Sequence, residues 1–319
     1  MRPPVFYRRP PARSTGHRLA PPWSYSLAGM PNQEPAGTSG AAGPGAPKGA
    51  NGWGGGRAAG EDLRLAQADG PTLSAYLARP SFSAASGSGR DGIVLSHGFP
   101  EPQQKAGIPS YGYPQLAARL AAETGAAVLT FAFRGTGASG GDFSLGGWRA
   151  DLVTAVETLR AVPGIETIWL VGFAAGATLS ICAAGEDPSI GGVAAFAPPA
   201  EFLERGGDPR KFVAQARAAG VIRTRGYPPD VGAWAREWRE VSPTELVAKV
   251  PPRPLLIVHG ANDDVVPITD ARELADAARP TAELRVLAGA GHMLLYDPRA
   301  IALLLGWFDR HLGSAVAGP

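Results

Sequence analysis

Short apolar runs alternate with helical stretches along most of this 319-residue chain, and this alternation restricts its fold more than any other feature. The apolar runs cover residues 92–96, 126–133, 167–173, 192–197, 254–258 and 283–287. Helical patterns cover residues 113–123, 147–161, 175–184, 269–278 and 298–311. Buried strands that alternate with helices are typical of a parallel sheet with helices on both faces. The sequence therefore predicts an α/β fold with a mostly parallel, doubly wound sheet.

Two segments depart from this alternation. Residues 63–68 and 72–78 flank an Asp69-Gly70 turn and predict an antiparallel hairpin before the parallel strands. Residues 199–249 form an excursion where a single helix would suffice, and long excursions of this kind are usually lids or substrate-binding inserts. We expect a lid-like helical insertion, the alternative being an extra helix pair that only packs. Trp234 and Trp238 lie at helical spacing and fit either packing or substrate stacking.

Residues 1–60 have a composition unlike the rest of the chain. They contain 10 Pro, 12 Gly and seven Lys or Arg, but only Glu34 among acidic residues. Such a segment cannot bury enough apolar surface to offset its ordering entropy, so we predict disorder here and a folded α/β domain over residues 61–319. Met30 is an alternative start of the chain.

Charge and cysteine content indicate which binding partners and which cellular compartment fit this chain. The net charge is +6 over residues 1–60 and −4 over the remainder, and a mildly acidic domain argues against a nucleic-acid-binding surface. No run approaches 18 apolar residues, so no membrane span is expected. The single cysteine, Cys182, excludes an intrachain disulfide and fits a reducing cytoplasm.

One turn has the form of a catalytic elbow without its catalytic atom. Gly172 and Gly176 flank Ala174 between the apolar run at 167–171 and the small-residue helix predicted over 175–184. In this strand–turn–helix context, G-x-S-x-G motifs hold an exposed serine at a strained backbone position. The two glycines are present, but an alanine methyl group cannot attack a carbonyl.

Three further stretches, each at the end of a predicted strand, carry the other parts of a hydrolytic site. The oxyanion donors of such sites are the N–H after the nucleophile, here that of Ala175, and one from an earlier strand-end loop. In the turn at residues 96–100, that second donor is Phe99. Residues 258–267 supply a carboxylate that could orient an imidazole, and a glycine turn presents His292. Elbow, acid and histidine follow in the order expected for this type of hydrolase.

Together these stretches resemble the α/β-hydrolase superfamily over about residues 61–313, in particular its serine aminopeptidase-like and dienelactone hydrolase-like branches. The resemblance rests on LSHGFP, FRGTGASGGDFS, VGFAAG, LIVHGANDDVVP and GAGH. In the family, the acid lies three residues after the HG glycine and four before the proline, which selects Asp263 over Asp264. His292 matches the family's histidine, and Ala174 stands where the family has Ser, or less often Asp or Cys.

Other candidate sites have weaker support in the sequence. Residues 135–140 match G-x-G-x-x-G, but a dinucleotide site requires this motif to open a helix and an acidic residue near a strand end about 20 residues later. Glu157 instead falls within a predicted helix, so we expect no nucleotide cofactor, and no metal site either. Ser180 and Cys182 lie roughly 9–12 Å farther along the helix than position 174, too far to replace a nucleophile there.

Two functions remain open from the sequence. The first is an enzyme of the ester or amide hydrolase class whose catalysis is weak or altered because of Ala174. The second is a non-catalytic binding protein for an acyl, lactone or peptide-like small ligand. A serine deliberately replaced by alanine would leave the same sequence. Oligomeric state is not predicted.

Overall fold

The computed structural model describes residues 59–80, 90–100, 112–202 and 208–312. The segment predicted to be disordered lies outside these ranges, apart from its last two residues, which open the first strand.

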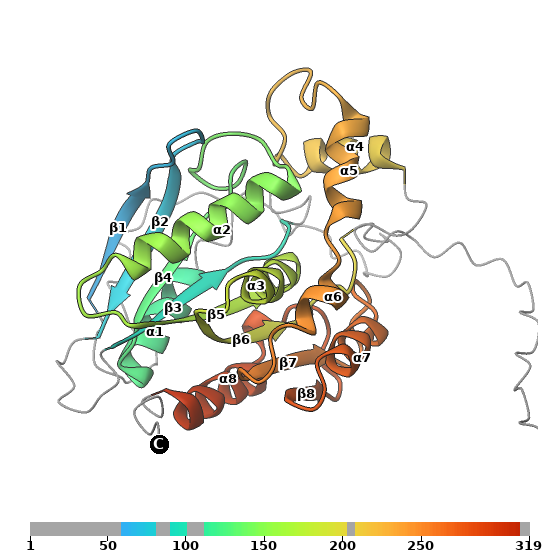
Figure 1. Ribbon diagram of the computed structural model, residues 1–319. Helices are drawn as coiled ribbons and strands as arrows, with labels where there is room; N and C mark the ends of the chain where they lie inside the picture. Colours follow the sequence, from blue (N-terminus) through green and yellow to red (C-terminus); the bar gives the residue numbers. More distant parts are fainter. Residues whose placement is uncertain (1–58, 81–89, 101–111, 203–207, 313–319) are drawn as a thin grey trace, which may run out of the picture.

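An eight-stranded sheet with the order β1-β2-β4-β3-β5-β6-β7-β8 forms the centre of the domain (Figure 1). β1 and β2 form the predicted antiparallel hairpin, and β2 is also antiparallel to β4. All neighbours from β4 onward are parallel. The strands are β1 (Ala59–Leu65), β2 (Leu73–Arg79), β3 (Asp91–Ser96), β4 (Ala127–Phe131), β5 (Thr167–Phe173), β6 (Ile190–Phe196), β7 (Leu255–Gly260) and β8 (Ala282–Leu287).

Helices cover both faces of this sheet, which confirms the doubly wound architecture (Figure 1). α2, α3 and α7 pack on one face, and α1 and α8 on the other. Along each central strand, alternate side chains enter the two cores: Val94 joins the first, whereas Ile93 and Leu95 join the second. These helices are α1 (Tyr113–Thr124), α2 (Leu145–Arg160), α3 (Ala175–Glu186), α7 (Ile268–Ala277) and α8 (Pro298–His311).

The insertion between β6 and β7 contains three helices with different roles. α4 (Pro209–Ala218) and α5 (Val231–Glu240) pack on each other, and α5 contacts α2 beyond the strand ends (Figure 1). α6 (Pro243–Val247) instead packs against α3 and α7. Only the first two helices therefore have the position of a lid, because the last part of the predicted lid segment belongs to the layers that cover the sheet.

Local sequence signals explain where the helices of the insertion begin. Asp208 and Asp230 each accept a hydrogen bond from a backbone N–H in the first turn of α4 and α5. Pro209 is the first residue of α4, a position where the missing N–H costs nothing. Within the described part of the chain, no helix is long and apolar enough to span a membrane.

Candidate active site

A strained turn joins β5 to α3. Ala174 has φ 48° and ψ −121°, a left-handed backbone conformation that disfavours any residue with a Cβ atom. The flanking glycines allow the close packing of this turn. A Cβ on Gly172 would lie 2.5 Å from the Cα of Ala177, and one on Gly176 would lie 2.3 Å from the carbonyl oxygen of His97. The sequence G-x-A-x-G thus forms the elbow that its glycines predict.

The end of β3 is fastened to this elbow. The Ser96 hydroxyl lies 3.1 Å from both the Gly176 carbonyl oxygen and the Ser180 hydroxyl, and all three are buried. A Cβ on Gly98 would lie only 2.9 Å from the Cβ of Ala174, so the loop after β3 passes directly beside the turn. Sequence reasoning missed Ser96, whose only sequence signal is a polar residue at the end of an apolar strand.

Backbone hydrogen bonds align the neighbouring strand ends. The Ala174 N–H donates to the Phe196 carbonyl at the end of β6, and the Ala197 N–H donates to the Val258 carbonyl in β7, both at 2.8 Å. Ala197 is the second non-glycine residue in the described ranges with positive φ, at 49°. Strained backbone concentrates at functional sites, and both examples here occupy the same edge of the sheet.

An acid–histidine pair lies at this edge. Asp263, after β7, and His292, after β8, form a hydrogen bond with 2.9 Å between Oδ2 and Nδ1. The other carboxylate oxygen, Oδ1, accepts N–H bonds from Val265 and Val266, each at 2.9 Å. Burial acts to raise the pKa of Asp263, but the His292 bond and charge and these two N–H groups outweigh it and hold that pKa below its usual value. Asp263 is therefore a fixed carboxylate that accepts a hydrogen bond from His292.

A second histidine approaches the same carboxylate. His259 is fully buried, with Nε2 2.9 Å from the Val266 carbonyl oxygen and 3.4 Å from Oδ2 of Asp263. Burial lowers the pKa of His259, although the Val266 carbonyl and the Asp263 charge act in the opposite direction. Its Nε2–H therefore donates to the Val266 carbonyl while the neutral ring lies beside Asp263, a contact that the sequence analysis did not predict.

His97 fastens the loop that carries Phe99. Its Nδ1 lies 2.6 Å from the Gly98 carbonyl oxygen, while its Nε2 accepts the Phe133 N–H at 3.1 Å. These contacts require a proton on Nδ1 and none on Nε2. Burial lowers the pKa of His97 to about 4, although the Gly98 carbonyl raises it somewhat. His97 is thus a neutral brace between two loops.

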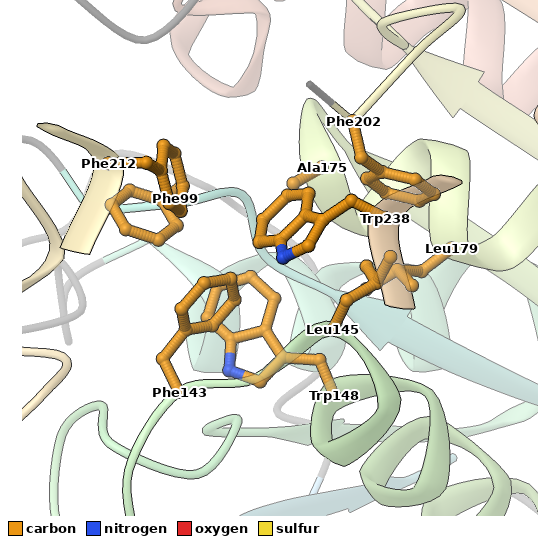
Figure 2. A pocket seen from close by; sticks show the side chains of 9 residues that line it. All are labelled: Phe99, Phe143, Leu145, Trp148, Ala175, Leu179, Phe202, Phe212 and Trp238. Carbon is orange, nitrogen blue, oxygen red and sulfur yellow. The ribbon is translucent and has the colours of Figure 1, made fainter. Parts of the chain in front are cut away.

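Phe99 and Ala175, the residues assigned as oxyanion donors, line one apolar pocket (Figure 2). Ala175 is the first residue of α3, so its N–H has no acceptor within the helix. The cavity is small, about 10 Å³, which is roughly what one water molecule requires. The lining residues are Phe99, Phe143, Leu145, Trp148, Ala175, Leu179, Phe202, Phe212 and Trp238. α2, α3, the loop after β3 and the two lid helices all contribute to it.

The structure thus brings the predicted residues to one edge of the sheet in two groups. Asp263 is hydrogen-bonded to His292, and Phe99 shares a pocket with Ala175. Ala174 adjoins Ala175 at the end of β5, with β6 between it and the strand that leads to Asp263. Phe143 and Trp148, two aromatic residues of the pocket, were missed as site residues, because in the sequence the first lies in a glycine-rich loop and the second appears as an ordinary helix-packing position.

Other residues with chemical potential are occupied by structural roles. Ser180 donates to the Gly176 carbonyl at 2.8 Å, and Cys182 is fully buried, which raises its pKa to about 12. The loop at 135–140 closes on itself through a bond from the Gly135 N–H to the Gly140 carbonyl, and α2 begins only at Leu145. Among the described residues, no cluster of His, Cys, Asp or Glu could hold a metal ion.

Solved structures with the same fold include an esterase and an α/β hydrolase. The Pyrococcus furiosus esterase Pf2001 is 19% identical, with a TM-score of 0.57 over 80% of this chain and 92% of its own. Est1E from Butyrivibrio proteoclasticus is also 19% identical, with a TM-score of 0.57 over 78% and 96%. The α/β hydrolase GrgF from Penicillium sp. sh18 is 20% identical, with a TM-score of 0.58 over 80% and 99%.

Sequence comparison identifies the family. No match was found among curated proteins. The family model described as "Alpha/beta hydrolase family" matches residues 93–302, well over half of the chain, and this range includes the elbow, the acid–histidine pair and the lid helices. The chain therefore belongs to the α/β hydrolase family.

Proposed function

We propose that this protein has the site of an ester-class acyl hydrolase in which only the nucleophile is missing, so that it binds esters and cleaves them slowly at most. The hydrogen bond between His292 and Asp263 carries this proposal. With its proton on Nδ1, His292 presents an unprotonated Nε2 that could accept a proton during catalysis. A site that needs no general base would not require a histidine oriented by a carboxylate.

In a relative with serine at position 174, the hydroxyl would attack the ester carbonyl while His292 takes its proton. The N–H groups of Phe99 and Ala175 would stabilise the oxyanion, and His292 would return the proton to the departing alcohol. Water, deprotonated by His292, would then attack the acyl-serine, releasing the acid while the proton returns to the serine oxygen. With Ala174, a water molecule has to attack, giving the same acid and alcohol with no covalent intermediate. Loss of the nucleophile lowers kcat on the order of 10⁶-fold in subtilisin, and we expect a reduction of similar size here.

The pocket favours an ester over a peptide with a free amino terminus. All of the lining side chains in the described part of the chain are apolar or aromatic, and none of them carries a carboxylate that could pair with an ammonium group. Burying an unpaired charge there would be costly. This supports the esterase-like branch over the aminopeptidase-like one, in keeping with the name of one fold neighbour, the esterase Pf2001.

We place the protein in a reducing compartment such as the cytoplasm, on the grounds that its single cysteine is buried and unpaired. A non-catalytic binding protein is the second candidate function, supported by the apolar pocket beside Ala174.

Steady-state hydrolysis of p-nitrophenyl acetate separates the two candidates. Ala174→Ser is expected to raise kcat/KM by several orders of magnitude over the unmodified chain. The double variant Ala174→Ser with His292→Ala should return to the level of the unmodified chain. If Ala174→Ser is folded and still inert, the site has lost more than its nucleophile and the binding function is the better conclusion.

A further inference from the structure

One polar atom in the apolar pocket has no partner. Trp238, on α5, is 6% exposed, and its indole Nε1 makes no hydrogen bond with any described part of the chain. Buried tryptophan N–H groups usually find an acceptor, because leaving one unpaired is costly. The Nε1–H of Trp238 could therefore donate a hydrogen bond to a ligand that enters the pocket.

Two neighbouring tryptophans show the ordinary situation. Trp234 donates from Nε1 to the Phe143 carbonyl at 3.2 Å, and Trp148 donates to the Arg134 carbonyl at 3.0 Å. Trp307, on α8, is unpaired like Trp238, but it lies in the core on the other face of the sheet. Trp238 differs from it because its indole lines the pocket beside Ala175.

The orientation of Trp238 directs this donor inward. In Figure 2, the edge of its indole that carries the nitrogen faces the middle of the lining side chains, between Trp148 and Leu145. None of the described lining side chains offers an acceptor oxygen. A ligand in the pocket could therefore supply one.

We propose that this pocket binds a neutral, apolar acyl or aryl group that carries one acceptor oxygen and presents it to Nε1 of Trp238. This deepens the proposed function and rests on it in one respect, since the ester carbonyl is taken to lie at Phe99 and Ala175. The oxygen bound by Trp238 is then a second one, such as an ether, keto or hydroxyl oxygen on the acyl part. A charged group is disfavoured, because no described lining side chain would pair with it.

Such a ligand requires the lid helices to shift. The cavity of about 10 Å³ is far smaller than a ring or a short acyl chain. Phe212 on α4 and Trp238 on α5 close it, with ring centroids 4.8 Å apart. α4 and α5 contact the remainder of the domain through this aromatic cluster and through hydrogen bonds such as those from the Gly146 N–H to Glu237 and from Trp234 Nε1 to the Phe143 carbonyl. None of these contacts belongs to the sheet, so the two helices can shift without disrupting it. Ligand binding selects this open arrangement.

Calorimetric titration of the unmodified chain tests the proposal. The probes are methyl phenylacetates with a methoxy group at ring position 2, 3 or 4, the matched ethyl compounds, and the matched aminomethyl compounds, which are cationic. At least one methoxy isomer should bind about fivefold more tightly than its ethyl counterpart, as expected for one net hydrogen bond. The cationic probes should bind at least tenfold more weakly than the methoxy probes. Absence of any methoxy preference, or equal binding of the cations, would overturn the proposal.

Two matched variants attribute the effect to the indole nitrogen. Trp238→Phe keeps a ring but removes the donor, so the methoxy preference should disappear. Trp234→Phe should retain it, because that nitrogen already donates to Phe143. Without ligand, Trp234→Phe should lower the melting midpoint more than Trp238→Phe, since only the first leaves an acceptor unpaired. Persistence of the preference in Trp238→Phe contradicts the assignment.

Failure of this inference and failure of the proposed function give different results. If Ala174→Ser cleaves p-nitrophenyl acetate but no methoxy preference exists, the hydrolase site stands and the pocket assignment is wrong. If the preference depends on Trp238 and Ala174→Ser remains inert, the pocket assignment stands and the protein is a binding protein.

Discussion

At the scale of single residues, the site is held by neutral histidines and one fixed carboxylate. His97 and His259 are buried, and burial lowers the pKa of both. Each uses its proton for a structural contact: His97 with the Gly98 carbonyl and His259 with the Val266 carbonyl. His292 is the histidine whose Nε2 remains for chemistry, because its Nδ1 is taken by Asp263.

His97 should make the folded state sensitive to mild acid. Its pKa is about 4 in the fold and about 6.5 in an unfolded chain, so between these values the unfolded state binds more protons. Stability should therefore be fully present above about pH 6.5 and fall, by up to about 3 kcal/mol, as pH drops toward 4. The lowered pKa of His259 acts in the same direction.

Urea denaturation at pH 5 and pH 7 measures this effect. His97→Gln is expected to be less stable than the unmodified chain at both values but to lose less stability between them. An equal loss in the variant and the unmodified chain would show that His97 is not held neutral in the fold.

At the scale of elements, the elbow depends on how closely α3 approaches the end of β3. A Cβ on Gly176 would lie 2.3 Å from the His97 carbonyl oxygen, and backbone cannot yield as a flexible side chain does. Gly176→Ala should therefore lower the free energy of unfolding by about 2–4 kcal/mol, within the range of other overpacking changes.

The matched control is Gly306→Ala in α8, where a Cβ would meet nothing within 4 Å. That substitution should raise the free energy of unfolding by about 0.5–1 kcal/mol, because alanine favours a helix more than glycine does. Urea denaturation of both variants provides the comparison. Equal, small effects would mean that the elbow is not closely packed.

Most elements could be predicted from the sequence because their signals are local. Apolar runs identified the strands, including both partners of the antiparallel hairpin, and the G-x-A-x-G turn identified the junction of β5 and α3. Local signals did not indicate that the insertion between β6 and β7 divides into two lid helices, α4 and α5, and a third helix, α6, that covers the sheet. α6 packs against α3 through contacts such as that between Gly185 and Leu246, which are far apart in sequence.

The same limit applies to the candidate site. Asp263 and His292 could be paired from motif order and strand ends. The approach of His259 to Asp263, the Ser96 bonds and the unpaired nitrogen of Trp238 could not, since each depends on how distant segments pack.

At the scale of the whole molecule, β1 is the first element of the domain that the structure describes. β1 pairs with β2 along its full seven residues, from Ala59 opposite Arg79 to Leu65 opposite Leu73. Leu65 is 3% exposed, so the strand also contributes to the core. A truncation that enters β1 removes both hydrogen bonds and buried apolar surface.

Two truncations test this boundary. Removal of residues 1–58 should leave the thermal midpoint within about 2 °C, because the Pro- and Gly-rich composition predicts no packed structure there. Removal of residues 1–65 should lower it by about 5 °C or more. A large loss from the shorter truncation would show that the N-terminal segment packs on the domain and that the predicted disorder is wrong.

The central claim is that the site lacks only its nucleophile, and covalent labelling tests it most directly. A fluorophosphonate reacts with a serine only when a base activates it and oxyanion donors receive the phosphoryl oxygen. Intact-mass measurement should show one adduct per chain for Ala174→Ser, located on the peptide that contains position 174. The unmodified chain and the double variant Ala174→Ser with His292→Ala should remain unlabelled. A folded Ala174→Ser variant that takes up no label would contradict the account.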